Sequence, residues 1–387
     1  MSKRTRTVPA RAGMRREIAP PGQTSPGPAG TESSSEARSG ARTDASSGPP
    51  APPPGGTSDT ARSVVSGIAR SPERDACPAC GSVEYRTLFS ATDRLFRTTD
   101  RRFEVVECAG CGLVRLYPRP TPEELAAYYP GDYWYTPAGG LAGRLEQVYR
   151  RLVLRDHVRF VRRALRDAGG SGLVLDVGCG SGLLLSLLKQ DGARVFGLET
   201  SPRAASMAWR VNGIPCACGD LAHAPLPEGS CSLVTMFHVL EHLAEPDEYI
   251  AAAHRLLAQD GRLVVQSPNL ACWQFLLLGE LWRGLDVPRH LIDFRASDLE
   301  ALLESCGFEV VRRKHFSLRD NPSAFATSVA PWLDPALRPA LAGPERPALR
   351  LIKSMLYMAL VAAAIPFSAL EAACRAGATV MLEAKKK

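Results

Sequence analysis

The chain has 387 residues, 45% of them hydrophobic, and a formal net charge of +7. This length and composition are typical of a globular protein with one large domain and a smaller module. Ten Lys/Arg face five Asp/Glu in residues 1–72 and three lysines end the chain, so residues 73–384 carry about −1. The folded part therefore offers no net basic field for a nucleic acid, and we expect no such partner.

Residues 1–72 are rich in Pro, Gly, Ser, Ala and Arg and contain almost no aromatic residues. Such a segment cannot bury enough apolar surface to offset its loss of conformational entropy, so we predict a disordered tail. An organelle transit peptide is the alternative, although Pro and Gly oppose the amphipathic helix that it needs. The charged N-terminus and the odd count of eleven cysteines favour a reducing, cytoplasmic location.

Two matched CxxCG units follow the tail, and 27 residues separate them. Four thiolates in tetrahedral geometry select Zn²⁺ over harder ions, so we predict a structural zinc site rather than four unrelated thiols. The spacing leaves no open coordination position, and the metal is not interpreted as catalytic. The predicted zinc ligands are Cys77, Cys80, Cys108 and Cys111.

Residues 73–135 are predicted to form a small zinc-ribbon-like module that ends in an aromatic turn, and residues 136–170 a linker helix. The aromatic residues of the turn are expected either to pack the module against the next domain or to form the floor of a substrate pocket. They are Tyr128, Tyr129, Tyr133, Trp134 and Tyr135.

Strand and helix patterns alternate from residue 171 to the end of the chain, which indicates a parallel sheet covered on both faces. Residues 297–313 add a helix and a sixth strand, and 378–386 reads as a seventh strand. The other expected strands are 173–177, 194–199, 214–218, 231–237 and 261–267, and the expected helices are 181–190, 201–211 and 246–258.

An insertion at about 317–375 contains the apolar run 354–370, which Pro366 interrupts. A membrane-spanning helix needs about 20 apolar residues, so this run is marginal. We expect it to be buried against the core. The alternative is a helical hairpin that contacts a membrane surface, with the protein then peripherally membrane-associated.

The sequence D-x-G-x-G-x-G follows the first strand of the alternating region, at the sheet edge where α/β proteins bind ligands. Asp176 would repel a pyrophosphate but would lie beside a cationic amine. Glu199 ends the second strand, where it can accept from both hydroxyls of a ribose. Asp220 follows the third strand and can accept from an adenine amino group. These carboxylates favour a cationic cofactor without phosphate.

The segments "LDVGCGSG", "VFGLETS", "GDLAHAPLPEGSCSLVTMFHVLEHL" and "GRLVVQSPN" resemble, in order, the strand-end motifs of class I S-adenosylmethionine (SAM)-dependent methyltransferases over about 171–316. The resemblance implies a Rossmann-like, doubly wound, seven-stranded sheet with an antiparallel last strand. It also implies SAM as the cofactor. The residues assigned to the cofactor are Asp176, Gly178, Cys179, Gly180, Gly182, Glu199, Asp220, Leu221 and His238.

The zinc ligands with "YYPGDYWY" also resemble bacterial methyltransferases that carry an N-terminal zinc domain, a group that includes deoxysugar C-methyltransferases. The extra C-terminal domain of those enzymes does not follow here. The expected acceptor is therefore a small molecule, with a sugar- or lipid-linked compound as the suggestion.

Methyl transfer from a sulfonium is an in-line displacement, for which a protein supplies alignment and, for a hydroxyl or a carbon acid, a base. His290 and His242 are the candidate bases, and Glu241 is a candidate for orienting a histidine. Three alternatives stay open: a zinc-finger RNA methyltransferase, a non-catalytic cofactor-binding homologue, and, more distantly, a dinucleotide oxidoreductase. The segment "FHVLEH" stands where enzymes that methylate exocyclic amines of bases carry N/D-P-P-Y, which disfavours that RNA chemistry.

Overall fold

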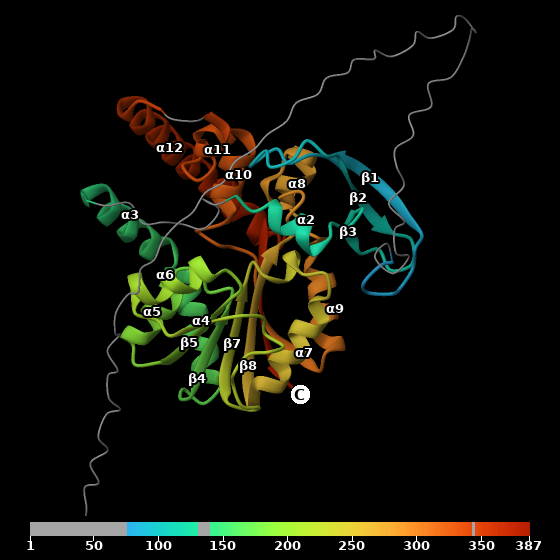
Figure 1. Ribbon diagram of the computed structural model, residues 1–387, viewed down its shortest axis with the longest axis vertical. Helices are drawn as coiled ribbons and strands as arrows, with labels where there is room; N and C mark the ends of the chain where they lie inside the picture. Colours follow the sequence, from blue (N-terminus) through green and yellow to red (C-terminus); the bar gives the residue numbers. More distant parts are fainter. Residues whose placement is uncertain (1–75, 131–139, 343–344) are drawn as a thin grey trace, which may run out of the picture. The chain divides into compact units, whose positions relative to one another are not determined.

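The computed structural model describes residues 76–130, 140–342 and 345–387, all within one compact unit, Ser66–Lys387 (Figure 1). The predicted tail and the aromatic residues Tyr133, Trp134 and Tyr135 lie outside the described residues.

A seven-stranded mixed sheet forms the centre of this unit, in the order β10-β11-β8-β7-β4-β5-β6. The pairs β4–β5, β5–β6, β4–β7 and β7–β8 are parallel, whereas β11 is antiparallel to both β8 and β10. The predicted fold class and its antiparallel last strand are therefore confirmed. The strands are β4 (Leu173–Val177), β5 (Arg194–Glu199), β6 (Cys216–Cys218), β7 (Cys231–Phe237), β8 (Leu257–Pro268), β10 (Phe308–Lys314) and β11 (Thr379–Lys386).

Helices cover both faces of the sheet, which is why strand β4 is apolar and almost wholly buried along its length. Side chains of α4 and α5 pack in one apolar cluster, and those of α7 and α9 pack in the other. The sequence placed the end of α7 two residues late, because Leu257 already has an extended backbone and opens β8. The helices are α4 (Arg155–Asp167), α5 (Leu183–Gln190), α6 (Pro202–Asn212), α7 (Pro246–Leu256) and α9 (Ala296–Ser305).

The cysteine-containing segment forms a second, four-stranded antiparallel sheet in the order β1-β2-β3-β9. Its fourth strand comes from far along the chain: Val114 pairs with Asp293 and Arg115 with Ile292. The module is thus joined to the body by backbone pairing as well as by the covalent chain. The elements are β1 (Tyr85–Ala91), β2 (Phe103–Cys108), β3 (Val114–Tyr117), α2 (Pro122–Ala127) and β9 (Ile292–Asp293).

Two helices, α3 (Gly140–Val153) and α4, occupy the segment where the sequence predicts one linker helix. The chain changes helix at Leu154, and the second helix does more than connect. Val158, Val161 and Leu165 of α4 are buried in the same cluster as α5, so α4 covers the central sheet.

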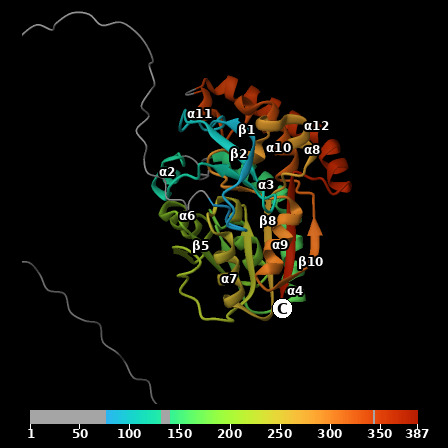
Figure 2. The same ribbon diagram turned by 90° about the vertical axis from the view of Figure 1, so that its right-hand side faces the viewer.

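The insertion folds as short helices and one long helix above the carboxyl ends of the strands (Figures 1 and 2). Two expectations for residues 354–370 are wrong: α12 continues through Pro366, and most of its surface is exposed. Because α12 is one continuous helix that is buried along one stripe only, the predicted burial against the core and the alternative of a helical hairpin are both wrong. The elements of the insertion are α10 (Asn321–Val329), the 3-10 turn η4 (Pro331–Leu333), α11 (Arg338–Ala342) and α12 (Pro347–Ala373). Outside it lie α8 (Trp273–Leu278) and the 3-10 turns η1 (Leu240–His242), η2 (Gly279–Leu281) and η3 (Arg283–Leu285).

Candidate functional site

The glycine loop joins β4 to α5 and turns back on itself at the sheet edge. Gly178, Gly180 and Gly182 have φ of +70°, +53° and +72°, a region that favours glycine. A Cβ on Gly178 would stand 2.8 Å from Val239 Cγ2, so the loop also passes close to the segment after β7. The glycines are therefore required by backbone geometry and by close approach.

Glu199 ends the neighbouring strand β5 and is buried beside this loop. Its Oε2 accepts from the Gly180 amide at 2.9 Å, and its Oε1 accepts from the Thr200 amide at 3.0 Å. Burial raises the pKa of Glu199, although the hydrogen bonds from these amides partly offset that rise. The carboxylate thus fixes the glycine loop against β5.

Asp176 lies one residue before the end of β4, opposite Gly197 and two residues before Glu199 on β5, and is only 4% exposed. Its Oδ1 accepts a hydrogen bond of 2.6 Å from Thr235 Oγ1. Burial raises the pKa of Asp176 to about 7, and the negative charge of Glu199 adds to that rise. Two carboxylates at adjacent strand ends form a site that a cation would stabilise and an anion would not.

Asp220 follows β6 and is bound to a neighbour on its own loop. Its Oδ1 accepts from the His223 amide at 3.0 Å and lies 2.9 Å from His223 Nδ1. Leu221 beside it is fully buried, and Cys179 Sγ lies 3.6 Å from Cys216 Sγ. The structure therefore gathers Asp176, the glycines and Glu199 around one loop, while Asp220 stands on the next loop with a histidine partner.

His238 follows β7 with a φ of +56°, and both of its ring nitrogens have partners. Its Nδ1 lies 3.1 Å from Glu241 Oε1, and its Nε2 lies 2.8 Å from Gln266 Nε2 and 3.7 Å from Asp320 Oδ1. Burial lowers the pKa of His238, but hydrogen bonds to Asp320 and Glu241 outweigh it and raise the pKa to about 9. His238 therefore lies between two carboxylates, which favour its charged form.

The side chains of Glu241, His242 and His290 lie close together, and Glu241 connects them to His238. One ligand atom from each lies within 4.8 Å of the others, and the two histidine rings are 4.7 Å apart. Ser267 Oγ donates to Glu241 Oε2 at 3.2 Å. Burial opposes the charge on Glu241, but His238 outweighs it and lowers the pKa of Glu241 to about 2. The sequence thus named three residues that the fold does bring together.

The two histidines differ in their surroundings. His290 is buried, its Nδ1 lies 2.7 Å from the Gly284 carbonyl oxygen, and burial with the neighbouring His242 lowers its pKa to about 4. His242 is half-buried, and its Nδ1 lies 3.1 Å from the Arg289 carbonyl oxygen and 3.0 Å from Tyr129 Oη. A carbonyl only accepts, so Nδ1 of His242 donates and its Nε2 keeps a lone pair.

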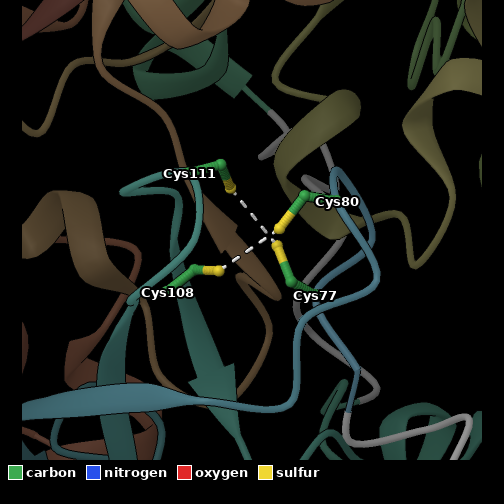
Figure 3. Close-up of side chains that lie close together, drawn as sticks. All are labelled: Cys77, Cys80, Cys108 and Cys111. Carbon is green, nitrogen blue, oxygen red and sulfur yellow. Dashed lines mark hydrogen bonds between the residues drawn. The ribbon is translucent and has the colours of Figure 1, made fainter.

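The four cysteines of the N-terminal module form a separate cluster (Figure 3). Cys77 Sγ lies 3.6 Å from Cys111 Sγ, and Cys80 Sγ lies 3.5 Å from Cys108 Sγ. All four sulfurs lie within 4.8 Å of one another. Thiolates bound to zinc at about 2.3 Å in a tetrahedron are separated by similar distances, so the donor set fits that ion.

A family described as a methyltransferase domain matches residues 146–313. The chain is 32% identical over 160 residues to a Mycolicibacterium smegmatis protein named "Probable S-adenosylmethionine-dependent methyltransferase", over 40% of this chain and 58% of that protein. It is 30% identical over 149 residues to the "Ubiquinone biosynthesis O-methyltransferase" of Pseudomonas aeruginosa, over 35% and 64%. A SAM-dependent methyltransferase structure from Archaeoglobus fulgidus has a TM-score of 0.39 at 19% identity, covering 64% of this chain and all of that one.

Residues 146–313 form a class I SAM-dependent methyltransferase domain. The resemblance and enzyme class predicted from the motifs are confirmed for this segment. The chain spans less than two thirds of the length of the two relatives it matches.

The structure also places near these groups three polar residues that the sequence did not predict. Gln266 ends β8, and Asp320 stands just before α10; its Oδ2 accepts from Gln266 Nε2 at 2.7 Å. Arg289, beside His290, is fully buried and donates to Asp93 of the N-terminal module at 2.7 and 2.9 Å. "RDNPS" is a helix-start signal that marks Asp320 locally, whereas nothing local marks Arg289.

Proposed function

We propose that this protein transfers a methyl group from SAM to a hydroxyl or carbon acid of a small-molecule acceptor. The observation that carries the proposal is the pair of buried carboxylates, Asp176 and Glu199, on either side of the glycine loop. When bound, SAM supplies an electrophilic methyl group on a positively charged sulfur. A dinucleotide would instead place its pyrophosphate near Asp176, which would repel it.

Each part of the loop has a role in this proposal. Glu199 accepts from the ribose hydroxyls while it anchors Gly180, and Asp176 faces the cationic amine of the methionine moiety. The positive φ of Gly178 and Gly180 lets the backbone approach that moiety closely. Asp220 and Leu221 remain predicted contacts of the adenine, and His238, in the loop after β7, remains a predicted neighbour of the cofactor.

At the acceptor end, we assign His242 as the base and Glu241 and His290 as the groups that position it. Nδ1 of His242 is held by the Arg289 carbonyl, which leaves Nε2 to take a proton from the acceptor as the methyl group arrives. Glu241 is ionised and stabilises the protonated imidazole. The relative named as a ubiquinone biosynthesis O-methyltransferase supports an oxygen acceptor.

Replacement of Glu199 by alanine is expected to weaken SAM binding by at least about 100-fold. Hydrogen bonds to a charged group contribute about 1.5–3 kcal/mol each, and two ribose hydroxyls would lose theirs. Titration calorimetry of wild type and variant with SAM, S-adenosylhomocysteine and NADH measures the effect. Glu228→Ala, an exposed carboxylate beyond β6, is the matched control.

The wild-type chain should bind SAM and S-adenosylhomocysteine but not NADH. Unaltered SAM affinity in Glu199→Ala would remove Glu199 from the site. Tighter binding of NADH than of SAM would overturn the cofactor assignment.

We further propose that the four-cysteine cluster holds one structural zinc ion. Purified chain is expected to contain about one zinc, and Cys108→Ser to lose it and to make residues 76–118 sensitive to protease. Elemental analysis with limited proteolysis tests this, and Cys218→Ser on β6 is the control. Metal-free wild type after expression in zinc-supplemented medium would contradict the proposal.

A further inference from the structure

Helix α12 contacts the rest of the molecule along one narrow stripe. Its buried residues recur at helical spacing and face α10, where Thr327 Oγ1 lies 3.0 Å from Tyr357 Oη. These residues are Tyr357, Val361, Ala364, Ser368 and Glu371. The remaining surface of the helix is turned away from the body.

That surface is apolar, which is unusual for an exposed helix. Residues 354–370 contain no Asp, Glu, Lys or Arg, and only 17% of the most apolar 18-residue window of α12 is buried. A surface helix of a globular protein normally turns charged residues outward. Exposed apolar areas of this kind mark interaction sites.

Helix α8 extends the apolar surface. Trp273 packs against Phe367 with ring centroids 6.4 Å apart, and Gln274 Nε2 donates to Glu371 Oε2 at 3.1 Å, so α8 lies against α12. Six of the exposed apolar residues of the two helices are here called the apolar face; they are 54–75% exposed. They are Leu276, Leu277, Ile352, Met355, Leu356 and Leu370.

Charge and aromatic residues border this face. Arg346 and Arg350 are exposed at the start of α12, and Arg375 is exposed just beyond its end. Trp332, in η4 against α12, is 54% exposed. A cationic border with an exposed Trp beside an uncharged apolar surface is the pattern of a helix that lies in a lipid interface.

We propose that the apolar face docks on the surface of an anionic lipid bilayer. The helix lies in the interface and does not cross it, because the stripe from Tyr357 to Glu371 stays packed on α10 and α8. Its 27 residues extend about 40 Å along the membrane plane. The arginines at its two ends contact lipid headgroups, while the leucines and methionines enter the acyl boundary.

The docked face lies on elements that also reach the methyltransferase site. Asp320 caps the start of α10 and accepts from Gln266, beside His238. An acceptor with an apolar tail, held in the same membrane, would therefore arrive at the strand ends. This second step rests on the proposed function, whereas membrane docking does not.

The test is flotation of the full-length chain with vesicles of phosphatidylcholine alone and with vesicles in which about a third of the lipid is anionic phosphatidylglycerol. Wild type is expected to float with the anionic vesicles. Met355→Glu with Leu276→Glu should lower the bound fraction by at least about tenfold. The control, Trp209→Glu with Val311→Glu, changes two exposed apolar residues elsewhere and should float like wild type.

Sedimentation of the same variants without lipid measures their oligomeric state and tests whether a second copy of the chain, rather than a membrane, covers the apolar face. Wild type that does not float, or a face variant that floats as well as wild type, would overturn the proposal. A dimer that the face variant abolishes, without flotation of wild type, would show that a second copy covers the face. SAM affinity of the face variant should match wild type, which separates failure of docking from failure of the cofactor site.

Discussion

Replacement of His242 by alanine is expected to lower methyl-transfer turnover by about 100- to 10,000-fold, the usual contribution of a general base. SAM affinity should stay within about twofold, because His242 lies beyond the glycine loop and Glu199. The reason is the geometry of its ring: the Arg289 carbonyl fixes Nδ1 as the donor, and Nε2 is left to accept a proton. Single-turnover kinetics with labelled SAM measure the loss.

His254→Ala on α7 is the matched control, since this histidine packs on Phe308 away from the strand ends. Its turnover should equal that of wild type. Turnover of His242→Ala above about one tenth of wild type would remove His242 as the base.

His290 was the other candidate base, and the structure assigns it less of that role. Burial lowers its pKa to about 4, which makes it a weak base at neutral pH. Its Nδ1 donates to Gly284, which fixes the ring next to His242. We therefore propose His290 as a neutral neighbour that packs against the ring of His242.

Replacement of Arg289 by methionine is expected to lower the free energy of unfolding by about 3–5 kcal/mol. Arg289 lies between Asp93 and Asp286, and all three side chains are buried. The guanidinium lowers the pKa of both carboxyl groups below their usual range, although burial alone would raise it. Without it, two carboxylates remain buried next to each other without a cation.

Urea unfolding of wild type and variant measures this loss. Arg86→Met, which breaks the exposed pair of Arg86 with Glu107, is the control and should cost less than about 1 kcal/mol. A variant as stable as wild type would show that the Arg289 network does not couple the N-terminal module to the methyltransferase domain.

The sheet and the glycine loop could be predicted because their signals are local. An apolar run followed by D-x-G-x-G-x-G gives a buried strand, a turn with positive φ and a helix start. Glu199 follows from the same reasoning, since parallel strands end at one sheet edge. The central strands accordingly lie within a few residues of the expected ranges.

The contacts between the two modules could not be predicted in this way. Strand β9 has only two residues, Ile292 and Asp293, and its pairing with β3 depends on how the whole chain folds. The Asp93–Arg289 pair joins residues 196 positions apart. Asp320 carries a local helix-start signal, yet its place beside His238 depends on the path of the insertion.

The exposure of α12 was predicted wrongly for a related reason. A helix that is apolar on all sides is normally buried, and the sequence pattern alone favours burial. Only the tertiary structure shows that α12 is buried along a single stripe and that most of its remaining surface is exposed.

In the proposed function, the carboxylate-flanked glycine loop binds SAM and His242 acts as the base for methyl transfer. The most direct measurement is the transfer of label from methyl-labelled SAM to a panel of hydroxyl acceptors, with and without apolar tails, by wild type and His242→Ala. We predict that wild type labels at least one acceptor, with release of S-adenosylhomocysteine, and that the variant binds SAM but transfers little label. Equal labelling by both proteins, or SAM binding without transfer to any acceptor, would contradict the account.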